Sequence, residues 1–264
     1  MKKKILALCL VVVLAITAVT GATLAYFTDT DAATNTMTLG NVSIEQIEME
    51  RGENGALVNF TQDKPLYPAV NPNMDWAEEE AVDFTQIEGA AHGSQYPFVE
   101  PNAQDKFVFV KNTSTLKSDA FVRTLVAFEA GSLTMAEHDA MIGLSYHDAT
   151  WTIGEQVYTT IGGKNYVVME MVYTGRANDD DDKNGVLPAG QTTTASLCQI
   201  YLASSATNET ATALDGNKNN KYDIIVLSQA VQTQGFTDPQ TALNTAFGTV
   251  TEANATEWFE AIGA

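Results

Sequence analysis

The chain has 264 residues, of which 33 are acidic and 14 are basic, so its formal net charge at pH 7 is −19. A surface this acidic repels nucleic acid and anionic lipid, which argues against nucleic-acid-binding classes of protein. Hydrophobic residues make up 45% of the chain. This content argues against disorder and predicts a folded domain.

The first 25 residues have the pattern of a secretory signal peptide. Three lysines at positions 2–4 precede an apolar run over 5–19, and small residues follow it. Ala25 and the threonine two positions before it fit the two small subsites of a signal peptidase, so we expect cleavage between Ala25 and Tyr26. The alternative is a retained membrane anchor, but about 15 apolar residues span only part of a hydrocarbon core that needs roughly 20.

Cleavage would leave a mature chain of 239 residues with a net charge of −22, because three basic residues and no acidic residue leave with the signal peptide. This length is enough for one sizeable domain or two small ones. Cys9 would also be lost, and Cys198 would remain alone, so no intramolecular disulfide is expected. We predict that Cys198 is a buried strand residue rather than a reactive thiol.

Residues 26–40 are predicted to form an extended N-terminal arm that precedes a single domain over 41–264. The arm contains no proline, is rich in threonine and alanine, and starts with Tyr26, Phe27, Thr28 and Asp29. Such a segment can complete the sheet of a neighbouring copy by β-augmentation. It can equally pack on its own domain as a first strand, and the sequence leaves both alternatives open.

The domain begins with a half-buried strand over 39–50, in which Val42 and Ile44 face inward because apolar and polar residues alternate. Residues 51–104 contain five prolines and predict long loops, with one or two helical turns over 76–83.

The sequence of the rest of the domain predicts several short strands and peripheral helices. Strands at 105–110 and 120–128 are joined either as a hairpin or across to a facing sheet. Further strands are expected over 150–160, 164–173, 192–202 and 222–227, the last continuing to Ala230-Val231. The pair 150–160 and 164–173 is joined at Gly162-Gly163. Three helices are expected: one over 133–143, one that begins at Asp238-Pro239, and one over 251–261. In the first of them, Thr134 and Glu137 have the spacing of a capping box.

This succession predicts a mainly β fold, with two antiparallel sheets packed as a sandwich, long loops and short helices at the periphery. No strand–helix–strand alternation supports a parallel sheet, and no repeat of 20–50 residues is present.

Residues 20–44, TGATLAYFTDTDAATNTMTLGNVSI, resemble the N-terminal segment of the TasA/camelysin proteins, which Gram-positive bacteria secrete through a dedicated signal peptidase. The resemblance recurs at 111–113, 120–123, 187–192 and 223–236. It implies a jelly-roll-like sandwich and a structural subunit of biofilm-type extracellular matrix or cell-surface fibres. The implied partners are further copies of the chain, other matrix or cell-wall components, and the signal peptidase during export.

We expect no catalytic residue and no enzyme activity. The sequence lacks the His-Glu-x-x-His motif of zinc proteases, the Gly-x-Ser-x-Gly motif of serine hydrolases and the glycine-rich loops that bind phosphate. Some camelysin relatives are described as metalloproteases, which leaves that activity as one alternative. The histidines that would have to serve it, His92, His138 and His147, form no such motif.

Two acidic loops have the oxygen spacing of calcium sites. In the first loop, the side-chain oxygens at positions 1, 3 and 5 of a calcium loop would come from Asp180, Asp182 and Asn184, and the glycine at position 6 would be Gly185. The twelfth position, however, is not a glutamate. The second loop has similar spacing, at Asp215, Asn217, Asn219 and Asp223. Calcium is the one candidate cofactor, and the alternative is that both loops are solvated polar turns.

A second functional alternative is a monomeric surface adhesin or binding module. It would use an aromatic contact patch in the loops over 61–104, formed by Tyr67, Trp76, Tyr96 and Phe98.

Overall fold

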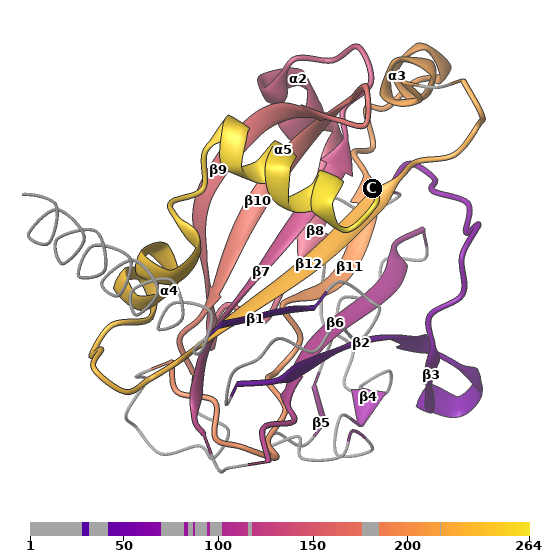
Figure 1. The fold of residues 1–264 in the computed structure, drawn as a ribbon. Coiled ribbons are helices and arrows are strands. Elements are labelled where there is room, and N and C mark those ends of the chain that lie inside the picture. The colour runs from indigo at the N-terminus through magenta and orange to yellow at the C-terminus, as the bar shows by residue number, and fades with distance from the viewer. Residues whose placement is uncertain are drawn as a thin grey trace, which may run out of the picture.

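A computed structural model of the chain shows two five-stranded antiparallel sheets packed against each other, with helices at the periphery (Figure 1). It describes residues 28–31, 42–69, 82–83, 87, 94–95, 102–115, 118–175, 185–216 and 218–264. The predicted mainly β, two-sheet antiparallel sandwich is confirmed.

The first sheet has the strand order β1-β12-β7-β10-β9, and every neighbouring pair is antiparallel. Its strands are β1 (Thr28–Asp31), β7 (Ala120–Glu129), β9 (Trp151–Ile161), β10 (Lys164–Tyr173) and β12 (Ile224–Gln232). The predicted hairpin at Gly162-Gly163 joins β9 to β10, and both glycines have positive φ, as a tight two-residue turn requires.

The second sheet has the order β3-β2-β6-β11-β8. Its strands are β2 (Ile44–Arg51), β3 (Leu57–Asn59), β6 (Gln104–Asn112), β8 (Ile142–Ser145) and β11 (Leu197–Leu202). The short helix η1 (Glu53–Gly55) lies between β2 and β3, and β4 (Val82–Asp83) pairs with β5 (Ser94–Gln95) apart from both sheets.

Successive strands cross between the two sheets. From β6 onward, β6, β8 and β11 belong to the second sheet, whereas β7, β9, β10 and β12 belong to the first. The β2–β3 pair stays within the second sheet and the β9–β10 hairpin within the first. This repeated crossing places consecutive strands in facing sheets, as in a β-sandwich. It also decides how 105–110 and 120–128 are joined, because β6 and β7 face each other from different sheets.

The central strand β7 of the first sheet is buried on both faces, since all ten of its residues are buried. The residues that alternate along β7 contribute to different clusters. Ala120, Val122, Val126 and Phe128 pack in the core between the two sheets, whereas Phe121, Leu125 and Ala127 pack on the opposite face. Helices α4 and α5 cover that opposite face (Figure 1).

The described helices are α2 (Met135–Met141), α3 (Asn208–Leu214), α4 (Pro239–Phe247) and α5 (Glu252–Ala261). The capping box of α2 is confirmed, since the Thr134 hydroxyl accepts from the Glu137 N–H while the Glu137 carboxylate accepts from the Thr134 N–H. Asp238 caps α4 as predicted, accepting from the Thr241 N–H at 2.7 Å. Among the described residues, no helix is both long and apolar enough to cross a membrane.

Several local predictions differ from the structure. Residues 57–59, expected within a long loop, form β3 and pair with β2. The helix expected over 133–143 ends at Met141, because Ile142 is drawn into the core and pairs with Leu202 as the start of β8. The strand expected over 192–202 is regular only from Leu197. Residues 82–83 form β4 instead of a helical turn, and 76–81 lie outside the described residues. Helix α3 was not predicted, because its threonine-rich sequence contains few strong helix formers.

Candidate functional site

The outer edge of β12 is the first candidate site, because part of the predicted arm lies on it (Figure 1). β1 pairs antiparallel with β12, from Thr28 opposite Val231 to Asp31 opposite Ser228. Thr28 and Asp29 therefore belong to the first sheet of their own chain. β1 covers four of the nine residues of β12, and residues 224–227 continue beyond it.

Past the end of β1, a side chain from the second sheet contacts the same edge. The Ser228 hydroxyl donates to Oε1 of Gln46 at 2.8 Å, and Nε2 of Gln46 lies 3.5 Å from the Val226 carbonyl oxygen. Gln46 belongs to β2, so it connects the two sheets on the side of the sandwich where β1 lies. A short strand and one glutamine thus contact the outer edge of β12, which has no proline and no lysine.

The other arm and cleavage residues, Ala25, Tyr26 and Phe27, lie outside the described residues. The first calcium candidate lies outside them too, with Asp180, Asp182 and Asn184. Signal cleavage and calcium at this loop remain predictions.

In the second calcium candidate, the side-chain oxygens of Asp215, Asn219 and Asp223 are engaged with the chain itself. The Asp215 carboxylate accepts from the N–H groups of Asn219 and Asn220 at 3.0 and 2.7 Å. Asp223 pairs instead with Lys164 at 2.6 Å, and Asn217 lies outside the described residues. No group of three or more histidine, cysteine, aspartate or glutamate side chains lies together in the described part of the chain.

A buried carboxylate that the sequence did not predict holds this second loop. Glu129, fully buried at the end of β7, accepts from the N–H of Gly216 and from the N–H of Asp223, both at 3.0 Å. Burial raises the pKa of the Glu129 carboxyl above its ordinary value. The loop between α3 and β12 is therefore fixed by hydrogen bonds to a carboxylate in the first sheet.

The two described histidines have neighbours within the chain. His138 is buried, and its Nε2 lies 3.0 Å from the Tyr222 hydroxyl while its Nδ1 lies 3.2 Å from the Asp139 carboxylate. Nδ1 of His147 lies 2.8 Å from the Thr150 hydroxyl. His92 is outside the described residues. Cys198 is buried as predicted, and burial raises the pKa of its thiol to about 12.

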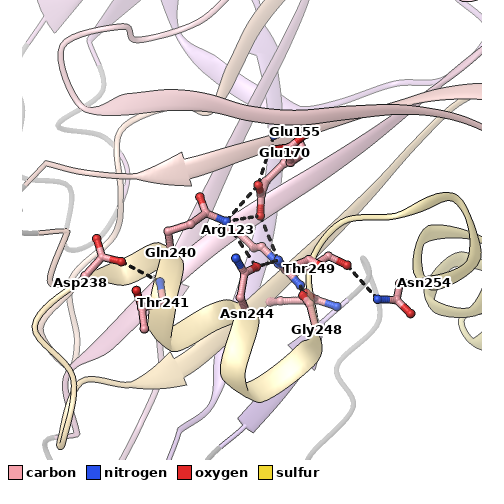
Figure 2. Close-up of polar contacts among 11 residues, drawn as sticks. Arg123, Glu155, Glu170, Asp238, Gln240, Thr241, Asn244, Gly248, Thr249 and Asn254 are labelled. Carbon is pink, nitrogen blue, oxygen red and sulfur yellow. Dashed lines mark hydrogen bonds and ion pairs between the residues drawn. The ribbon is translucent and has the colours of Figure 1, made fainter.

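A buried polar cluster lies beneath α4, on the helix-covered face of the first sheet (Figure 2). Arg123 of β7 and Glu170 of β10 form an ion pair at 2.9 Å, and both side chains are completely buried. The Arg123 guanidinium also donates to Oε1 of Gln229 at 2.7 Å, to Oδ1 of Asn244 at 3.2 Å and to the Gly248 carbonyl at 3.1 Å.

Glu170 has the complementary set of contacts. Nε2 of Gln240 lies 3.1 Å from both of its carboxylate oxygens, and the Glu155 N–H lies 3.3 Å from one of them. The ring of Trp258, from α5, lies 4.8 Å from the guanidinium carbon of Arg123. The ion pair therefore connects four strands, β7, β9, β10 and β12, to α4, to α5 and to the turn between these helices.

A pocket of 410 Å³ opens beside this ion pair. Its walls come from β9, β10, α4 and the segment before α5, and its lining residues are Gly154, Glu155, Glu170, Gln240, Asn244, Thr249 and Val250. A side chain at Gly154 would collide with the Glu170 carboxylate, because an added Cβ would lie 2.3 Å from Oε2. The pocket and the ion pair thus form one structural unit.

We did not predict Arg123, Glu170 or Glu129 from the sequence as functional or structural sites. A signal was present, since Arg123 and Glu170 each interrupt an otherwise apolar strand, AFVRTLVAF and YVVMEMVY. A charge inside such a strand is buried only when it has a partner. Two opposite charges on different strands therefore indicate a pair, although the sequence does not show that the strands are neighbours.

Comparison with known proteins gives no match: no family profile, no curated protein and no solved structure is significantly similar to this chain.

Proposed function

We propose that this chain is a secreted structural subunit of extracellular matrix or cell-surface fibres, of the TasA/camelysin type, and not an enzyme. The subunits assemble by strand donation, in which the arm of one copy pairs with the β12 edge of the next copy. The proposal places the mature chain outside the cell after cleavage between Ala25 and Tyr26.

The observation that supports this mechanism most is the pairing of β1 with the edge of β12. The arm has strand geometry over Thr28–Asp31 and pairs there through only four residues. Exchange of an identical element between copies is a low-cost route to assembly, because the contacts made between copies equal those lost within each copy. β1 can therefore be replaced by the β1 segment of a neighbour without any new interaction chemistry.

The composition of the edge also supports strand exchange. Natural edge strands that must stay unpaired carry proline, lysine or an inward-pointing charge. β12 has the sequence IIVLSQAVQ, which contains none of these residues. The chain keeps a large negative charge, which favours solubility until assembly begins.

Assembly is tested with two purified chains, one starting at Tyr26 and one starting at Gly40, compared by electron microscopy and sedimentation. We expect fibres from the chain that starts at Tyr26 and monomers from the chain that starts at Gly40. A third chain with Thr28→Pro and Asp29→Pro keeps the length of the arm but removes N–H donors from β1, and it should stay monomeric. The matched control, Thr28→Val with Asp29→Asn, keeps strand propensity and should form fibres.

If every chain stays folded and monomeric, strand donation is contradicted, and the monomeric binding-module alternative becomes the better account. If the chain starting at Gly40 forms the same fibres, the arm is not the assembly element.

A further inference from the structure

The pocket beside the Arg123–Glu170 ion pair has a rigid floor. Glu170 is held by Arg123 and by Gln240, and Arg123 is held in turn by Asn244 and the Gly248 carbonyl (Figure 2). These contacts fix the strands and α4 relative to each other without any ligand. A ligand entering the pocket would therefore meet side chains that are already positioned, which lowers the entropy cost of binding.

Several polar groups of the lining retain hydrogen-bonding capacity within the described structure. Gln240 contacts the ion-pair network through Nε2, which leaves its Oε1 as an acceptor. Asn244 contacts the network through Oδ1, which leaves its Nδ2 as a donor. The exposed Glu155 carboxylate adds acceptors. The hydroxyl of exposed Thr249 can donate and accept.

The lining excludes two classes of ligand. It contains two carboxylates and no lysine or arginine, and the nearby Arg123 guanidinium is engaged by four partners, so an anion would be repelled. Val250 is the one lining residue with an apolar side chain, so a lipid or an aromatic ligand would find little apolar surface to cover.

The remaining choice is between a cation and a neutral polar ligand. A cation uses acceptors alone, whereas this lining presents donors beside acceptors, and one of its two carboxylates is already paired with Arg123. A hydroxyl group both donates and accepts hydrogen bonds, so a ligand with several hydroxyl groups matches the amide, carboxylate and threonine side chains that line this pocket.

We propose that the pocket binds a neutral saccharide, one or two sugar residues in size. This site is separate from the β12 edge and does not depend on fibre assembly.

The proposal is tested by calorimetric titration of the mature chain with glucose and with cellobiose, and in parallel with glucuronate and calcium chloride. We expect the neutral sugars to bind with a Kd on the order of 1 mM, which is typical of a small ligand with a few hydrogen bonds. Glu155→Gln should weaken binding about tenfold, because it removes a charged acceptor. Thr249→Trp, at an exposed position, should fill the pocket and abolish binding.

Glu257→Gln is the matched control, since Glu257 is exposed on α5 and does not line the pocket. It should leave sugar binding unchanged. The proposal is overturned if neither sugar binds, if glucuronate or calcium binds more tightly than both sugars, or if Thr249→Trp and Glu257→Gln bind equally well. Thermal unfolding of each variant verifies that it is folded.

Discussion

At the scale of single residues, the main feature of this protein is an arginine and a glutamate buried where apolar residues are expected. Arg123 and Glu170 lie on the face of the first sheet that α4 and α5 cover. Burial of either charge alone would be strongly unfavourable, whereas together they satisfy each other and fix the helix. A buried pair of this kind specifies a geometry more than it adds stability.

Removal of one partner should therefore be costly. In Glu170→Ala, the Arg123 guanidinium stays buried without a countercharge, and we expect the free energy of unfolding to fall by about 3–5 kcal/mol. Urea denaturation measures this change. Glu257→Ala on the exposed surface of α5 is the control and should change stability by less than ~0.5 kcal/mol.

The double variant Arg123→Met with Glu170→Leu separates loss of the pair from exposure of an unpaired charge. It should be more stable than Glu170→Ala alone, because it leaves no isolated buried charge. A Glu170→Ala protein as stable as the wild type would show that the guanidinium does not need this partner.

His138 should make stability depend on pH. Its ring is buried against Phe128 and Tyr222, and burial lowers the pKa of His138 below its ordinary value of 6.5. The neutral ring is thus favoured in the folded state, so its contribution is complete above about pH 6.5 and declines as the pH falls toward the folded pKa.

This expectation is tested by measuring the free energy of unfolding of the wild type and of His138→Gln from about pH 7.5 to about pH 5. The other titrating groups are present in both proteins, so the difference between them reports on His138. We expect the wild type to lose more stability than the variant over this range. Identical pH dependence in the two proteins would mean that His138 is not the titrating group.

At the scale of elements, α4 is the helix that joins the C-terminal region to the sandwich. Ala242 and Leu243 pack with Phe121 and Val231 of the first sheet, while Gln240 and Asn244 contact the buried ion pair. The position of its N-terminus therefore determines the shape of the pocket as well as the packing of the sheet.

Removal of the cap of α4 should weaken this attachment. Asp238→Ala leaves the Thr241 N–H without its acceptor, and we expect a loss of about 1 kcal/mol in the free energy of unfolding. Asp148→Ala, at an exposed aspartate in a turn, is the control for the change of charge. Equal stability of the two variants would show that the cap contributes nothing.

Prediction from the sequence succeeded for elements with a strong local pattern. The apolar runs of β7 and β10, the glycine turn between β9 and β10, and the caps at Thr134 and Asp238 were all visible locally. β8 was not predicted, because its four residues become a strand only through pairing with β11.

At the scale of the whole molecule, the features that the sequence could not reveal join residues far apart in the chain. β1 pairs with β12 across about 200 residues, and the Gln46 contact with Val226 spans 180. The pocket likewise combines β9, β10 and α4. Hydrophobic periodicity indicates which face of an element is buried, but not which distant element covers it.

The central claim is that the arm exchanges between copies at the β12 edge, and the register of β1 allows a direct test. Thr28 lies opposite Val231, so we would prepare one mature chain with Thr28→Cys and another with Val231→Cys, each also carrying Cys198→Ala. The two chains are mixed under assembly conditions, oxidised and separated without reductant. We predict disulfide-linked pairs that contain one copy of each chain. A mixture that stays monomeric, while a single chain carrying both cysteines closes its own disulfide, would contradict strand exchange.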